Sequence, residues 1–191
     1  MNESGYFIKV NNFFEYTISE EYVDLHLQGD FHDMFEELGK RKASAIIAKK
    51  LIEAVTIINN KRSMGDLKLK KCSSIHMRSP IFYAPTFYFK SLRNQHVRDK
   101  IKIESPICTM FRLLGIKTDT YTIDELKNPK FVQQNKEAQI AVKDFGPNKD
   151  VGIVDLPFDK FNSKGFQEKL RILNKVFVKL LGPNKEEREL Y

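Results

Sequence analysis

Two histidines and an aspartate lie close together near the start of the chain. His26, Asp30 and His32 belong to the segment His-Leu-Gln-Gly-Asp-Phe-His. Imidazole nitrogens and carboxylate oxygens are ligands for divalent metals, and a bound metal lowers the pKa of a water ligand enough to supply a nucleophile. This pattern would suit a hydrolase or transferase acting on a phosphorylated or otherwise anionic substrate. The alternative, which we favour, is that Asp30 caps a helix and His32 lies on the surface.

A second acidic motif, Gly65-Asp66-Leu-Lys68, has the acid and lysine pairing found in many metal-dependent nucleases. That chemistry needs at least one more carboxylate from a neighbouring strand. The nearest acids in the same stretch of chain are Glu53, well upstream, and Asp99, well downstream. We therefore interpret Asp66 as a turn residue that is followed by a solvated strand lysine.

Charge is segregated along the chain. Residues 1–39 carry one basic and nine acidic side chains, whereas residues 40–102 carry sixteen basic and three acidic ones, a net charge of +13. If these cations share one face, their field attracts polyanions such as nucleic acid, anionic lipid or an acidic protein. The alternative is that the acidic block folds against the basic block and the field largely cancels.

Aromatic residues interrupt the basic block. They are Phe82, Tyr83, Phe87, Tyr88 and Phe89. Exposed rings stack on the bases of single-stranded nucleic acid while cations follow the phosphates, although several of these rings are expected in the core instead. The predicted nucleic-acid contacts are Lys68, Lys70, Lys71, Arg78, Lys90, Arg93, Arg98, Lys100 and Lys102.

These observations support three hypotheses for function. The leading one is a polyanion-binding protein, with nucleic acid as its partner and no cofactor. The second is an enzyme that uses a divalent metal at His26, Asp30 and His32, with His76 as a further candidate. The third is an adaptor that docks an acidic protein. The chain lacks a Walker loop, a Gly-X-Gly-X-X-Gly motif, a nucleophile elbow and a Cys-X-X-Cys pair, which disfavours cofactor enzymes built on glycine-rich loops.

The elements that must position these residues follow from hydrophobic spacing and from Gly, Pro and capping signals. Residues 6–10 and 22–27 alternate as two strands of a hairpin, and residues 67–77 predict one or two further strands with a basic face. Short strands are also expected at 101–104 and 151–156, and a loop at 157–165. Helices are predicted over residues 31–38, 42–60, 89–98, 106–114, 122–128, 131–142 and 166–181.

Strands and helices interleave, which predicts an α/β or α+β fold with a single mixed sheet covered by helices. With 191 residues and 41% hydrophobic residues, one core suffices, so we expect a single domain over 1–191 with a frayed tail after residue 183. The most apolar stretch, 43–58, is broken by three charges and cannot span a bilayer. The start of the chain lacks the layout of a secretory signal, so we expect a soluble, cytoplasmic protein in which Cys72 and Cys108 are buried thiols.

Overall fold

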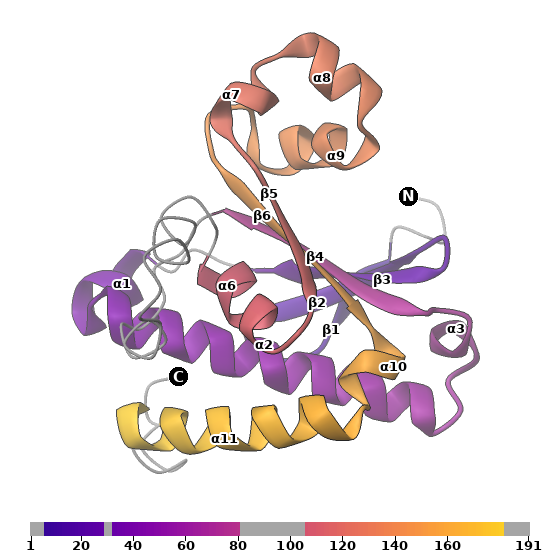
Figure 1. Cartoon of the computed structure of the whole chain (residues 1–191), viewed down its shortest axis with the longest axis vertical. Helices are drawn as coiled ribbons and strands as arrows, with labels where there is room; N and C mark the ends of the chain where they lie inside the picture. Colours follow the sequence, from indigo (N-terminus) through magenta and orange to yellow (C-terminus); the bar gives the residue numbers. More distant parts are fainter. Residues whose placement is uncertain (1–5, 29–31, 81–105, 182–191) are drawn as a thin grey trace. The chain divides into compact units, whose positions relative to one another are not determined.

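The structure is a computed structural model that describes residues 6–28, 32–80 and 106–181 (Figure 1). Its strands form one mixed sheet in the order β1-β2-β3-β4-β6-β5, accompanied by several helices, which confirms the predicted fold class. The chain divides into two compact units. Met1–His76 and Leu156–Tyr191 form the first, and Met77–Asp155 form the second. The prediction of a single domain therefore stays a prediction.

In the first unit, β1 (Ile8–Lys9), β2 (Phe14–Ser19) and β3 (Tyr22–Leu27) form an antiparallel meander. The expectation that 6–10 and 22–27 form a hairpin with each other was wrong, because β2 lies between them and pairs with both. The side chain of Asn11 accepts hydrogen bonds from the backbone N–H groups of Phe13 and Phe14, both at 2.9 Å, and so turns the chain sharply from β1 into β2.

The helices of the first unit confirm most of the predicted helical segments. The long α2 (Lys40–Ser63) follows α1 (His32–Leu38) after Gly39, whose φ of 83° favours a residue without a Cβ. The last helix, α11 (Lys164–Leu181), lies beside α2 (Figure 1). Asn59 and Asn162 exchange two side-chain hydrogen bonds of 2.8 and 2.9 Å, which join the last turns of α2 to the residues just before α11.

Two further predictions for the first unit were wrong. The predicted loop over 157–165 contains α10 (Phe158–Phe161), whose two terminal rings are buried. The first predicted strand of the 67–77 stretch is a helical turn, α3 (Leu67–Lys70), and only the second is a strand, β4 (Ser74–Pro80). Two apolar residues at spacing two are too short a pattern to separate a strand from a helical turn.

In the second unit, α6 (Pro106–Leu113) leads into β5 (Lys117–Tyr121), which pairs antiparallel with β6 (Val151–Pro157). The sequence did not indicate β5. Between these strands the chain forms α7 (Ile123–Leu126), α8 (Pro129–Gln134) and α9 (Lys136–Phe145), grouped at one end of the strand pair (Figure 1). The capping box at Thr122 starts α7 as predicted, but Asn135 caps α9 and divides the single helix that was predicted over 131–142.

The second unit has its own hydrophobic cluster, made by α7, α9 and β6, with Leu126, Ala138 and Val151 among its buried members. None of the helices in the described part of the chain combines the length and the apolar character needed to span a lipid bilayer.

A charged pair joins β4 to α9. Arg78 of β4 is only 6% exposed. Its Nε lies 2.6 Å from one carboxylate oxygen of Glu137 in α9, and its Nη2 lies 3.1 Å from the other oxygen. Such two-point pairing of a guanidinium with a carboxylate is among the strongest polar interactions in proteins. It fixes α9 against the end of β4 within the second unit.

We predict that Glu137→Ala lowers the free energy of unfolding by about 3 kcal/mol, because it deprives a buried guanidinium of this partner. Urea unfolding followed by circular dichroism measures the loss. Glu168→Ala is the matched control, since it breaks an exposed Glu168–Arg171 pair of the same chemistry and should cost much less, because solvent screens exposed ion pairs. Equal losses in the two variants would contradict the structural importance of the buried pair.

Candidate functional site

The single turn of α3 presents a cluster of lysines. The carboxylate of Asp66 accepts hydrogen bonds from the backbone N–H groups of Lys68 (3.1 Å) and Leu69 (3.2 Å), and so starts the helix. Leu69 is fully buried, whereas Lys68, Lys70 and Lys71 are exposed. Burial of Leu69 and capping by Asp66 therefore fix the turn that presents the three lysines at the surface.

Two hydrogen bonds of Cys72 hold the end of α3 in place. Its carbonyl accepts a hydrogen bond from Nε of Arg62 at 3.1 Å, and its Sγ donates to the carbonyl of Lys68 at 3.6 Å. The prediction of a buried thiol is confirmed for Cys72, which is 1% exposed, while the side chain of Cys108 lies outside the described residues. Burial raises the pKa of the Cys72 thiol, so this residue acts in packing and not as a nucleophile.

A hollow of about 370 Å³ lies beside α3, and we call it the lysine groove. Tyr6, Ile8, Ile18, Glu20, Leu67, Lys68 and Lys71 line it. Tyr6 is 65% exposed and Leu67 is 75% exposed, although both are large and largely apolar. The groove thus combines an exposed ring, aliphatic side chains, two ammonium groups and the carboxylate of Glu20. Such a combination suits a ligand with flat apolar parts and negative charge.

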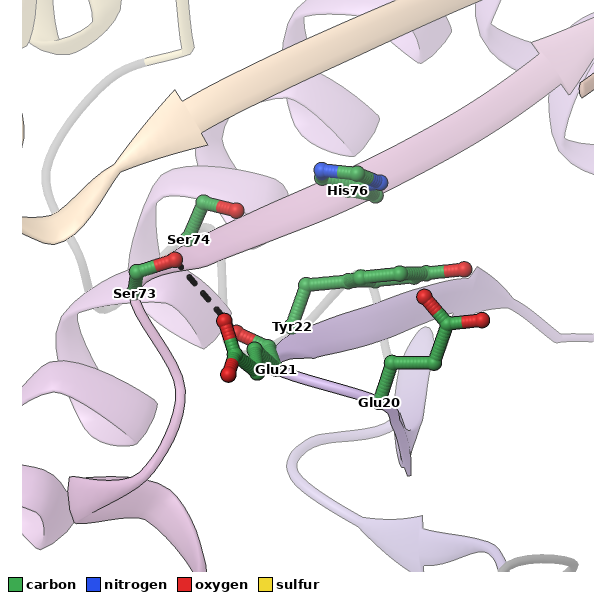
Figure 2. Close-up of a pocket in the computed structure, with 6 residues that line it drawn as sticks. All are labelled: Glu20, Glu21, Tyr22, Ser73, Ser74 and His76. Carbon is green, nitrogen blue, oxygen red and sulfur yellow. Dashed lines mark hydrogen bonds between the residues drawn. The ribbon is translucent and has the colours of Figure 1, made fainter.

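A second hollow of about 450 Å³ lies at the tip of the β2–β3 hairpin, and we call it the polar pocket (Figure 2). Glu20, Glu21, Tyr22, Ser73, Ser74 and His76 line it. The rings of Tyr22 and His76 are stacked, with centroids 4.0 Å apart and planes 16° apart. Figure 2 shows the Glu20 side chain extending towards the Tyr22 ring. The lining contains many hydrogen-bond acceptors.

The hairpin tip connects the two hollows. The register Ser19↔Tyr22 leaves Glu20 and Glu21 as a two-residue turn. The N–H of Ser73, just after α3, donates a 2.8 Å hydrogen bond to the carbonyl of Glu21. Among the described residues other than glycine, only Glu20 has a positive φ, at 56°. Glu20 lines both hollows, so the lysine groove and the polar pocket share a side chain.

The structure separates the predicted contact residues into three groups. Lys68 and Lys71 line the lysine groove, and Lys70 is exposed on the same turn. Arg78 is buried against Glu137, so we leave it out of the proposed surface. The remaining predicted contacts and the aromatic run lie outside the described residues: Lys90, Arg93, Arg98, Lys100, Lys102, Phe82, Tyr83, Phe87, Tyr88 and Phe89.

Several other cations of the 40–102 block interact within the first unit. Nζ of Lys61 lies 5.8 Å from the centre of the Tyr16 ring, and the guanidinium of Arg62 lies 4.6 Å from that of Phe158. Nζ of Lys50 is 3.3 Å from the Glu53 carboxylate. These contacts occupy some cations of the basic block, whereas Lys68 and Lys71 lie beside the lysine groove.

The predicted metal residues are only partly described. His26 lies in β3, where its Nε2 is 3.2 Å from Oγ1 of Thr17 and its ring packs edge-on against Phe7. Asp30 and the side chain of His32 lie outside the described residues, so the metal site stays a prediction. Within residues 6–28, 32–80 and 106–181, no three His, Cys, Asp or Glu side chains gather closely enough to hold a metal ion. His76, the further candidate, lies in the polar pocket.

Sequence reasoning missed Tyr6, Leu67 and Glu20 as site residues. Tyr6 begins a segment that was assigned to a half-buried strand, which hid its exposure. Glu20 stands at a turn that contains no Gly, Asn, Asp or Pro, the residues by which tight hairpins are usually found. The alternation of Phe14 to Ser19 was the available signal, because it places Glu20-Glu21 directly between two strands.

No protein-family model matches the chain, and comparisons with curated proteins and with solved structures found no significant match.

We predict that Asp66→Ala lowers the free energy of unfolding by about 1 kcal/mol, because two backbone N–H groups of α3 lose their acceptor. Thermal unfolding followed by circular dichroism measures the effect. Asp66→Asn keeps a capping oxygen, so its free energy of unfolding should differ from that of the parent protein by no more than roughly 0.3 kcal/mol. If Asn destabilised as much as Ala, a role of Asp66 beyond capping would have to be sought.

Proposed function

We propose that this protein binds a polyanion, and specifically single-stranded nucleic acid, through the lysine groove. The observation that supports this proposal is the convergence of an exposed aromatic ring, Tyr6, with Lys68 and Lys71 around one hollow. The sequence suggested cations interleaved with rings further along the chain. The groove offers the same combination, built from residues that are distant in sequence.

The lysines, the ring and the aliphatic side chains of the groove each have a chemical counterpart in a nucleic-acid strand. Ammonium groups contact phosphate oxygens and release the counterions that were condensed there. An exposed ring stacks on a base, and each stacked base contributes about 1 to 3 kcal/mol. The side chains of Ile8 and Leu67 extend the apolar surface on which a base rests. Apolar side chains alone would suit a neutral ligand equally well. The positive charge of the lysines is the reason why we propose a polyanion.

The groove favours a single strand over a duplex. A base inside a duplex is stacked on both faces, and it meets Tyr6 only after it leaves the helix. A hollow of about 370 Å³ holds one or two unstacked bases but is far smaller than a duplex. Lys70 adds a third cation on the same turn. Lys90, Arg93, Arg98, Lys100 and Lys102 lie outside the described residues and remain predicted contacts.

We predict that replacing both Lys68 and Lys71 with Ala weakens binding of a fluorescein-labelled hexathymidylate and flattens its salt dependence. On a plot of log K against log salt, each phosphate contact to a single strand contributes a slope of about −0.7, so the slope should fall in magnitude by about 1.4. Fluorescence anisotropy between roughly 50 and 200 mM salt measures it.

The control for this variant is Lys169→Ala, an exposed lysine of α11 away from the groove. It should leave the slope within the error of the parent protein. An affinity of the parent protein that does not change with salt would refute the proposal. Binding of an acidic protein without any binding of the oligonucleotide would instead indicate the adaptor hypothesis.

We predict that Tyr6→Leu lowers the affinity for the same hexamer by about 1 kcal/mol or more, roughly a fivefold loss, because leucine keeps the apolar contact but cannot stack. The salt slope should not change, since no phosphate contact is removed. Tyr6→Phe keeps the ring and should bind like the parent protein. If leucine and phenylalanine behaved alike, stacking at this position would be excluded.

A further inference from the structure

We propose that the polar pocket receives a guanine base of the strand that is held in the lysine groove. This inference rests on the proposed function and specifies which base the site selects. Its starting point is that Glu20 lines both hollows. A strand that occupies the groove therefore passes directly beside the pocket, and one of its bases can enter there.

The lining of the pocket excludes the phosphate backbone. An ionised carboxylate accepts hydrogen bonds and donates none, and it repels a second negative charge. Glu20 and Glu21 supply two carboxylates, and Ser73 and Ser74 add hydroxyl oxygens. The group that enters must therefore be uncharged or cationic and must carry hydrogen-bond donors. Within a DNA strand, only the base edges meet this requirement.

Guanine matches a carboxylate better than the other bases do. Its Watson–Crick edge presents the N1–H and the N2 amino group side by side, so both oxygens of one carboxylate can accept a hydrogen bond. Adenine and cytosine each place a ring nitrogen acceptor beside their amino group. Thymine and uracil place their single N–H between two carbonyl oxygens. In these bases an acceptor would face a carboxylate oxygen, which costs binding energy because neither group supplies a proton.

The rings and the size of the pocket suit a purine. A hollow of about 450 Å³ exceeds the volume of a purine and leaves room for water. Tyr22 and His76 are half-buried and stacked on each other, so they form a rigid π surface at the wall of the pocket. A flat heterocycle stacks on such a surface, and the strength of stacking depends little on which base it is. The rings therefore supply affinity, and the carboxylates supply selectivity.

Glu20 is the carboxylate that we assign to base reading. Its side chain extends towards the Tyr22 ring (Figure 2), and its backbone φ of 56° lies in a region that residues other than glycine rarely adopt. Conformations of this kind cluster at binding sites, where the surrounding structure maintains them. Here the hydrogen bond from Ser73 to the carbonyl of Glu21 holds the next residue of the turn.

The test compares four fluorescein-labelled hexamers by fluorescence anisotropy at one salt concentration. One is hexathymidylate, and the others carry a single guanine, adenine or cytosine at the third position. A lone guanine cannot form a quadruplex. We expect the guanine hexamer to bind about fivefold or more tightly than the other three, the discrimination typical of a good two-point base contact.

The decisive variant is Glu20→Gln, which replaces one acceptor oxygen with a donor and keeps the size of the side chain. It should bring the four affinities together and strengthen binding of hexathymidylate, since it removes a negative charge from the lining of the lysine groove. Glu37→Gln, an identical change at an exposed position of α1, should keep the guanine preference. Circular dichroism melting checks that both variants fold.

The outcomes separate this inference from the proposed function. If the parent protein binds all four hexamers equally, the guanine pocket is refuted while the groove stands. Preference for another base, or a guanine preference that survives Glu20→Gln, also overturns the assignment. If none of the hexamers binds, the proposed function fails and the inference fails with it.

Discussion

The backbone hydrogen bond between Ser73 and Glu21 is the contact on which the arrangement of the site depends. It joins the tip of the β2–β3 hairpin to the segment that leaves α3, over a separation of 52 residues. Together with the contact of Ser73 Oγ to the same carbonyl, it continues the pairing of β3 with β4 to the hairpin tip and places the turn at Glu20 beside the segment that follows α3. Neither α3 nor the hairpin tip could define a hollow alone, so the two hollows follow from this junction.

The lysine groove and the polar pocket, which adjoin at this junction, differ in charge and polarity. The lysine groove brings Lys68 and Lys71 together with apolar side chains, whereas the polar pocket brings Glu21 together with hydroxyls and stacked rings, and Glu20 belongs to both. In the proposed complex, charges of opposite sign in adjacent hollows would orient the strand, since phosphates would be attracted on one side and repelled on the other. A uniform basic surface would hold a strand without such discrimination. The proposed base selectivity depends on this contrast.

Much of the secondary structure could be predicted because local signals determine it. The stripe of α2, the capping box at Thr122 and the proline start of α6 each specify an element within a few residues of chain. The misassigned segments lacked such local signals or carried misleading ones. The turn of α3 depends on the Asp66 cap and on burial of Leu69, and the break between α8 and α9 depends on one asparagine. The turn at Glu20-Glu21 carries no typical turn residue, so β2 was overlooked.

By itself the sequence determined a mixed fold of strands and helices and a concentration of cations in residues 40–102, because composition and periodicity are properties of the chain. Only the tertiary structure determined whether a given cation is buried in an ion pair or lies beside a hollow. In the sequence, Arg78 and Lys68 are both cations of the basic block. In the structure, Arg78 is buried against Glu137, 59 residues away along the chain, whereas Lys68 lines the lysine groove. Burial and pairing are set by neighbours distant in sequence, and for this reason the candidate site could be seen only after the chain was folded.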